Sequence, residues 1–312
     1  MNIELANLSH KQKLTALWSE AFGDSEKFIS SFLDAYMIPE YNVPIAVESN
    51  KIVSALYLVD FDLYSETKVL GSCAYLFAAA TKKSCRNKGY MSALVKYSAA
   101  LCANRGLKAV FLFPQTQNEK LFAFYSKFGF KTIYAAKSIK RKSGVNLDFS
   151  SFSLKHENIS DVNVFDALYG AYAAFTAKQA LAPMKDRLFY FKCASSYLET
   201  PENADTKTYF AVLENNVEKF CYVFYKKYMN TFYIDDIIVP DQNKNFAETA
   251  ELLADFILNS GDNITLGMNV LPVSMTDAEN MPLAMLLPLA RDVKNIADNL
   301  KSPVYINMFM NL

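Results

Sequence analysis

The sequence from Ala74 to Leu94 reads AYLFAAATKKSCRNKGYMSAL. Its apolar beginning predicts a buried strand ending near Ala80, and a helical pattern starts at Met91. Between them lie Gly89 and a basic loop that contains Lys82, Lys83, Arg86 and Lys88. The backbone N–H groups of a helix's first turn have no partner within the helix, and the helix dipole favours an anion there. This segment is therefore a candidate phosphate site, and a solvated cationic turn is the alternative.

Two further motifs follow this segment along the chain. Phe111–Pro114 is an apolar run closed by a proline, and Asn118 and Tyr125 lie seven residues apart ahead of Gly129-Phe130. With these motifs in this order, the chain resembles the GNAT family of acetyl-CoA-dependent N-acetyltransferases. Arg86–Met91 matches that family's Arg/Gln-x-x-Gly-x-Gly/Ala motif except at its last position.

The resemblance covers residues 1–140, and Met91 is its main departure. The family prefers Gly or Ala there, so the match depends on where the Met91 side chain points. If that side chain faces the core, only its N–H is needed and the site is kept. Otherwise cofactor binding is lost.

The order of predicted elements agrees with an α/β (α+β) GNAT fold, a mixed sheet flanked by helices. Two helices and a set of antiparallel strands precede the segment above, and residues 108–113 predict a strand parallel to 74–80 because a helix crosses between them. Weaker patterns after a hinge at 138–146 repeat the plan. They predict helices at 163–177, 183–198 and 245–259 and strands at 207–213, 218–226, 231–239, 263–270 and 303–310.

The chain is therefore expected to hold two tandem GNAT-like domains. Residues 1–140 would form the catalytic domain and residues 141–312 a second, degenerate one, since the loop after the 231–239 strand lacks both glycine and an Arg-x-x-Gly motif. This arrangement resembles the enhanced-intracellular-survival type of acetyltransferase without its sterol-carrier-like domain.

The composition limits which binding partners and which cellular compartment are expected. The net charge is zero, which gives no basis for nucleic-acid or membrane binding. Five cysteines without close pairs indicate free thiols in a reducing compartment. With neither a signal sequence nor a spanning segment evident, we expect a cytoplasmic protein. Two isolated histidines and no Cys/His cluster argue against a metal site.

The resemblance also implies roles for individual residues. Acetyl-CoA would be the co-substrate, with its pyrophosphate held by backbone N–H groups and its pantetheine arm paired with the strand end. Tyr125 would be the acid that protonates the leaving thiolate; the alternative is a core aromatic. The cofactor-binding residues would be Ala79, Ala80, Thr81, Arg86, Asn87, Lys88, Gly89, Met91, Ser92 and Asn118, with the N–H of Ala79 or Ala80 polarising the acetyl oxygen.

No residue is assigned as the general base. Glu48, Asp60, Asp62, Asp235 and Asp236 are each expected to be solvated or paired carboxylates. In aminoglycoside-modifying relatives the chain terminus serves as base, which makes the Leu312 carboxylate a candidate.

We therefore expect an N-acetyltransferase that acts on a primary amine of a small molecule or peptide, of unidentified structure and with no assigned oligomeric state. Two alternatives remain. One is a non-catalytic acyl-CoA-binding or regulatory module that kept the GNAT fold. The other is aminoacyl transfer from charged tRNA, against which the zero net charge and the intact motif of the first domain argue.

Overall fold

The computed structural model describes residues 1–36, 42–114, 118–140, 148–199, 205–241, 245–261, 264–271 and 279–300. The chain divides into two compact units. The first unit contains residues 1–62, 70–132 and 284–297, and the second contains residues 63–69, 133–283 and 298–312. Each unit is described by itself below.

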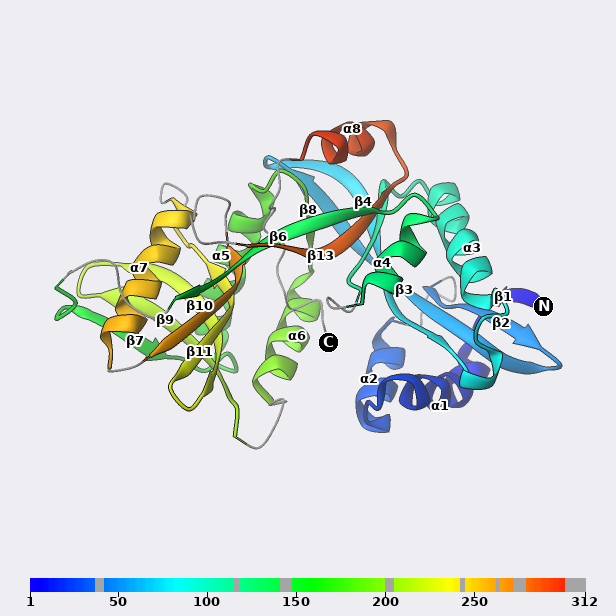
Figure 1. Cartoon of the computed structure of the whole chain (residues 1–312), viewed down its shortest axis with the longest axis horizontal. Helices are drawn as coiled ribbons and strands as arrows, with labels where there is room; N and C mark the ends of the chain where they lie inside the picture. The colour runs from blue at the N-terminus through cyan, green and yellow to red at the C-terminus, as the bar shows by residue number, and fades with distance from the viewer. Residues whose placement is uncertain are drawn as a thin grey trace. The chain divides into compact units, whose positions relative to one another are not determined.

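The first unit is built on the strands β1 (Asn2–Leu5), β2 (Pro44–Glu48), β3 (Lys51–Ser65), β4 (Lys68–Thr81), β5 (Ala109–Leu112) and β13 (Glu279–Pro288). They are hydrogen-bonded in the order β1-β2-β3-β4-β5-β13. β4 and β5 are parallel, as predicted, because helix α3 (Tyr90–Asn104) crosses between them (Figure 1). The remaining helices are α1 (Lys11–Phe22), α2 (Glu26–Tyr36), α4 (Glu119–Ser126) and α8 (Arg291–Asn299).

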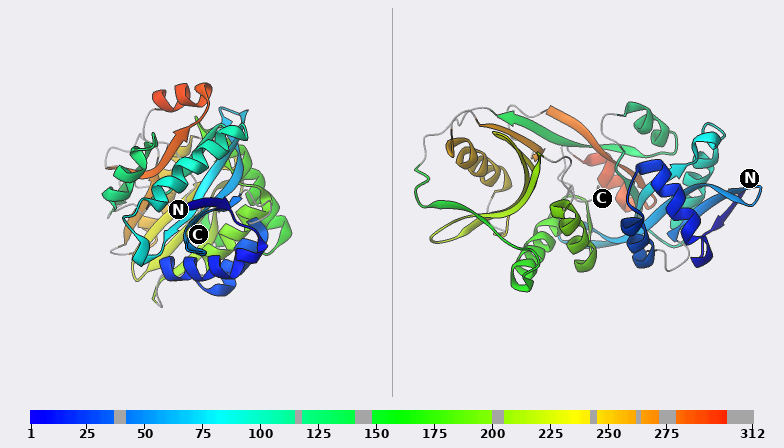
Figure 2. Two further views of the ribbon diagram at one scale, coloured as in Figure 1. Left: turned by 90° about the vertical axis from the view of Figure 1, so that its right-hand side faces the viewer. Right: turned by 90° about the horizontal axis from the view of Figure 1, so that it is seen from below.

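Alternating side chains of β4 separate two cores. Ala74 and Leu76 join the buried cluster that contains Leu94 of α3 and Tyr125 of α4. Tyr75 and Phe77 point to the opposite face and belong to a set of aromatic rings that includes Trp18 of α1. The sheet is therefore covered by α3 and α4 on one face and by α1 and α2 on the other (Figure 2).

Several of the described strands fall where the sequence pattern gave no expectation, and two of them pair with distant parts of the chain. β13, from late in the chain, pairs antiparallel with β5 in the first unit, with Met285 opposite Leu112. β6 (Lys131–Lys140) instead pairs with β12 (Thr265–Leu271), with Ser138 opposite Met268. The hinge predicted at 138–146 is therefore wrong at its beginning, because residues 138–140 are hydrogen-bonded in a strand. Its residues 141–147 lie outside the described part.

The second unit contains a sheet with the order β6-β12-β11-β10-β9-β7. Its further strands are β7 (Phe152–His156), β8 (Ala182–Met184), β9 (Lys207–Asn215), β10 (Lys219–Tyr228) and β11 (Thr231–Ile238), and its helices are α5 (Val162–Ala177), α6 (Arg187–Glu199) and α7 (Phe246–Asn259). The helices and strands predicted between 163 and 270 are found within a few residues. The strand predicted at 303–310 lies outside the described residues.

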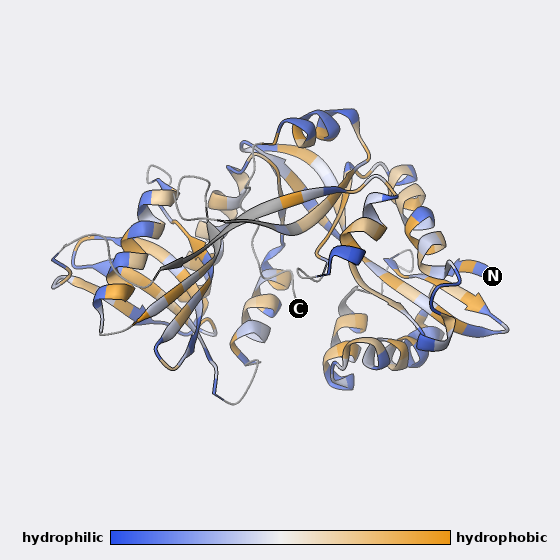
Figure 3. Cartoon of the chain, in the orientation of Figure 1, coloured by the Kyte–Doolittle hydropathy of each residue, from blue (hydrophilic) through white to orange (hydrophobic). Residues whose placement is uncertain are grey.

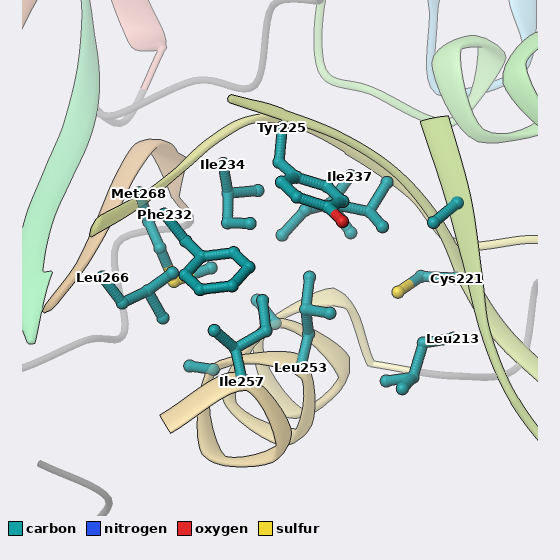
Figure 4. Close-up of a cluster of buried hydrophobic side chains, with 14 of the residues drawn as sticks. Leu213, Cys221, Tyr225, Phe232, Ile234, Ile237, Leu253, Ile257, Leu266 and Met268 are labelled. Atoms are coloured by element: carbon teal, nitrogen blue, oxygen red, sulfur yellow. The ribbon is translucent and has the colours of Figure 1, made fainter. Parts of the chain in front are cut away.

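The core of the second unit lies between α7 and the sheet. Leu253 and Ile257 of α7 lie in one buried cluster with Tyr225 of β10, Ile234 of β11 and Leu266 of β12 (Figure 4). Apolar and polar residues alternate around α7, so that one side of the helix can be buried (Figure 3).

Five free cysteines are buried in the two units, which confirms that they form no disulfides. Among the residues described above, no helix is both long and apolar enough to cross a membrane.

Candidate active site

The site begins where β4 and β5 part. Their register runs from Cys73 opposite Ala109 to Tyr75 opposite Phe111, whereas β4 continues to Thr81. Ala78 has φ of +45°, a left-handed conformation that interrupts the regular strand. A residue of this kind bends a strand and turns its backbone groups away from the ladder. The sequence places Ala78 at the start of the strand end that would pair with pantetheine, but its positive φ was not predicted, because alanine carries no preference for positive φ.

The end of β4 is held by β3. Ser54 is fully buried, and its Oγ donates to the carbonyl oxygen of Ala80 at 2.8 Å and lies 2.7 Å from Thr81 Oγ1. The N–H of Lys82 donates to the carbonyl of Val53 at 2.9 Å. Ala79 packs against the core cluster of the α3 face. The strand end that was predicted to meet the pantetheine arm is therefore a fixed platform.

The basic loop folds back on this strand end. Arg86 Nε donates to the carbonyl oxygen of Thr81 at 3.3 Å, so the Arg86 side chain braces the loop. Asn87 has φ of +63° and Gly89 has φ of +85°, which together turn the chain into α3. Arg86, Asn87, Lys88 and Gly89 are all exposed to solvent.

The N-terminus of α3 is open. Gly89 is its N-cap and provides no side-chain hydrogen bond, and the first turn of α3 contains no acidic residue. A Cβ built on Gly89 would meet no atom within 4 Å, so the glycine is needed for its φ and leaves free space in front of the helix. The first N–H groups of α3 are therefore uncapped and follow a basic loop, which suits an anion.

Met91 and Tyr90 secure this first turn from inside. Met91 packs against the core cluster of the α3 face, so its side chain does not occupy the phosphate position. The Tyr90 hydroxyl donates to the Glu48 carboxylate, and that hydrogen bond raises the pKa of Tyr90 to about 12. Ser92 is partly buried in the same turn.

Tyr125 lies on the inner side of α4. It belongs to the cluster that contains Leu76 and Tyr90, and its ring meets those of Phe124 and Phe130 edge-on at 5.0 and 5.7 Å. Burial raises the pKa of Tyr125 to about 12, so the phenol keeps its proton at neutral pH. Asn118 is the N-cap of α4, but its side chain makes no capping hydrogen bond.

Three of the eleven predicted site residues meet at one cluster. Ala79, Met91 and Tyr125 all contact it, and the loop of Arg86 to Gly89 lies between the β4 end and α3. Leu312 lies outside the described residues.

The expected carboxylate pairings are largely confirmed. Asp60 is paired with Arg105, and Asp235 accepts from the Tyr197 hydroxyl at 2.9 Å. Asp62 is exposed to solvent.

Comparison with known proteins defines the class. Residues 2–133 match the model of the acetyltransferase (GNAT) domain. The first unit therefore has the fold of a GNAT acetyltransferase domain, and the chain has the mixed sheets flanked by helices of tandem GNAT proteins. No curated protein sequence matches the chain.

Three solved structures illustrate the likeness. A probable N-acyltransferase of Enterococcus faecalis V583 has a TM-score of 0.70 and 14% identity over 92% of this chain and 72% of that chain. Eis1 from Mycobacterium abscessus has a TM-score of 0.67 and 12% identity over 94% and 75%. A tandem GNAT protein from the clavulanic acid biosynthesis pathway has a TM-score of 0.50 and 12% identity over 93% and 99%. At these identities the likeness is one of fold.

Proposed function

We propose that the protein is an acetyl-CoA-dependent N-acetyltransferase that acetylates a primary amine. One observation carries the proposal. The open, glycine-led N-terminus of α3 follows, after a short basic loop, the end of β4 that extends beyond its pairing with β5, so an anion site and a strand end that has left its neighbour lie in one short segment.

The residues of this segment suit the parts of the co-substrate. The N–H groups from Asn87 to Ser92 would hold the pyrophosphate, with Lys88 adding charge. The strand end at Ala79 to Thr81 would pair with the pantetheine amides. Arg86 is engaged with Thr81, so its main role would be to shape the loop.

Acetyl-CoA would supply an activated acetyl group as a thioester. A backbone N–H at Ala79 or Ala80 would stabilise the negative charge that develops on the acetyl oxygen, an interaction worth about 3 kcal/mol of barrier. The amine nitrogen bonds to the carbonyl carbon, the carbon–sulfur bond breaks, and its electron pair goes to sulfur. Tyr125 would donate its proton to that sulfur and recover one, through solvent, from the amine.

The pKa of Tyr125 constrains the timing of this proton transfer. With about 12 for Tyr125 and about 8.5 for a thiol, complete transfer is uphill by about 5 kcal/mol. Tyr125 would therefore stabilise the developing thiolate by hydrogen bonding, with late proton transfer.

Calorimetric titration with acetyl-CoA, followed by measurement of thiol release over a panel of amines, tests the proposal. Saturable binding together with amine-dependent thiol release is expected. Binding without release for any amine would instead identify a non-catalytic acyl-CoA-binding module, and absence of binding would overturn the proposal.

A further inference from the structure

The face of the first unit's sheet opposite α3 is covered by aromatic rings. Phe77 of β4 lies 5.3 Å from Trp18 of α1 and 5.1 Å from Phe32 of α2, measured between ring centroids. Tyr75 stacks on Phe111 at 5.1 Å with an interplanar angle of 10°. We call Trp18, Phe32, Tyr75, Phe77, Phe111 and Phe113 the aromatic cluster.

The aromatic cluster is closed at its base and open at one end. Trp18, Tyr75 and Phe111 are at most 4% exposed. Phe77 and Phe113, in contrast, are only partly buried. These two rings are therefore the members of the aromatic cluster that a ligand could contact.

That open end coincides with the parting of β4 and β5. Phe77 immediately precedes Ala78, the residue with positive φ, and Phe113 immediately follows the last residue of β5. The two rings therefore flank the point where the proposed thioester would lie, on the face of the sheet opposite α3. Since α3 and its loop would take the cofactor's phosphates, the amine would arrive from the aromatic side.

Two described acidic residues near the cluster are already engaged. Asp24, the carboxylate in contact with Trp18, accepts from the indole Nε1–H at 2.6 Å, and Asp34 is paired with Lys11 at 2.6 Å. The partly exposed rings therefore present aromatic faces and apolar surface. Such a surface binds an acceptor with an aromatic ring more tightly than a polyamine with several ammonium groups. Apolar surroundings also disfavour the charged form of an amine, so they promote the neutral nucleophile without a neighbouring base.

Resting on the proposed function, we propose that Phe77 and Phe113 bind the acceptor, and that the acceptor is a primary amine carried close to an aromatic ring. The ring stacks on Phe77 and Phe113, and the amine reaches the acetyl carbon between the ends of β4 and β5. Arylalkylamines have this form, whereas linear polyamines do not.

The chain contains a single tryptophan, Trp18, and it belongs to the aromatic cluster. Its fluorescence can therefore report occupancy of the cluster without any turnover. With acetyl-CoA present, 2-phenylethylamine is expected to change the Trp18 emission saturably, and spermidine and n-butylamine are not. We also expect kcat/KM for 2-phenylethylamine to exceed that for n-butylamine by about tenfold, the worth of one good aromatic contact.

A substitution of Phe77 tests whether the acceptor preference depends on the aromatic ring or only on the size of an apolar side chain. Phe77→Leu keeps an apolar side chain, and it is expected to remove most of the preference for 2-phenylethylamine over n-butylamine. Phe128→Leu is the matched control, because Phe128 is also partly buried but packs against the core cluster of the α3 face. It should leave the preference unchanged.

The outcomes distinguish this inference from the proposed function. Turnover of spermidine or n-butylamine at least as fast as that of 2-phenylethylamine, or an unchanged preference in Phe77→Leu, would overturn the aromatic acceptor alone. A saturable Trp18 response to 2-phenylethylamine without thiol release for any amine would support the acceptor site and count against catalysis. No Trp18 response to 2-phenylethylamine would overturn the inference.

Discussion

In each unit a helix follows a strand, α3 after β4 and α7 after β11, but the N-termini of the two helices are capped differently. α3 begins at Gly89, with no side-chain cap, no acid in its first turn and a basic loop before it. α7 begins at Asn245, whose side chain accepts from the N–H of Ala247 at 2.8 Å, and Glu248 lies in its first turn. An end that already has a side-chain acceptor and a negative charge disfavours a phosphate. Of these two helix ends, that of α3 is the one that suits an anion.

The two units also differ in how their first two helices pack, α1 and α2 in the first unit and α5 and α6 in the second. α1 and α2 meet their sheet through the aromatic cluster, which has partly exposed rings. Between α5 and α6 of the second unit, Tyr172 stacks on Tyr190 at 4.2 Å, and both rings are fully buried together with Lys185. The second unit has filled this region with its own side chains, which supports a structural role for it.

Lys185 is the most unusual residue of the filled region. Its backbone N–H donates to Tyr172 Oη at 3.0 Å, and its Nζ lies 5.7 Å from the centroid of the Tyr172 ring. Burial lowers the pKa of Lys185 to about 8, against the opposing effect of Cys193 and Asp236.

The largest effect is expected from removing the proposed acid of the first unit. Tyr125→Phe should lower kcat by about a thousandfold, the usual size of a general-acid contribution, while the Kd for acetyl-CoA stays unchanged because the ring still packs. Steady-state kinetics and calorimetry measure the two quantities. Tyr90→Phe, which loses only the bond to Glu48, is the control. A parallel rise of the Kd in Tyr125→Phe would contradict the acid role.

In the second unit, Lys185→Met should lower the free energy of unfolding by about 3 kcal/mol, since it removes a buried cation that attracts the buried Asp236 carboxylate. Denaturant unfolding measures this loss. The double variant Lys185→Met with Asp236→Asn should be less destabilised than the single one. Equal stability of Lys185→Met and wild type would show that the filled region does not depend on the charge.

The same lysine predicts a pH dependence. Its folded pKa, about 8, lies below its ordinary 10.5, so between these values the unfolded chain binds the proton more strongly than the folded one. The contribution of Lys185 to the free energy of unfolding therefore increases as the pH rises from about 8 to about 10.5. This increment should be absent in Lys185→Met, and its persistence there would assign it to another group.

Gly89→Val tests the open helix end of the first unit. A β-branched residue at this φ costs about 2 kcal/mol, which would displace the first turn of α3 and weaken acetyl-CoA binding by about thirtyfold. Gly106→Val is a matched control at the other end of α3, because Gly106 has φ of +77° and equally free space. It should lose stability but keep its affinity. Equal affinity for acetyl-CoA in both variants would show that the N-terminus of α3 does not bind the co-substrate.

The smallest effect concerns the cap of α7. Asn245→Ala should destabilise the second unit by about 1 kcal/mol without creating a second acetyl-CoA site. Thermal unfolding and titration stoichiometry check the two halves of this statement. An added binding site in Asn245→Ala would show that only the cap distinguishes the two helices.

Much of the fold of the first unit could be predicted from the sequence. The features that could not be predicted depend on contacts between distant residues. Periodicity and glycine placement located α3, β4 and β5, since these elements are formed by local patterns. The pairing of β13 with β5 joins residues far apart in the chain, and no local pattern encodes such a partner. The positive φ of Ala78 is likewise encoded by no local pattern, because alanine does not favour it. The filled region around Lys185 was missed because a single lysine in an apolar segment resembles a solvated one.

The proposed function requires one acetyl-CoA site per chain, at the N-terminus of α3. Calorimetric titration of the wild-type protein with acetyl-CoA tests this most directly. It should show one molecule bound per chain, with an affinity that weakens as salt is added because phosphates are involved. A stoichiometry of two, or no binding at all, would contradict it.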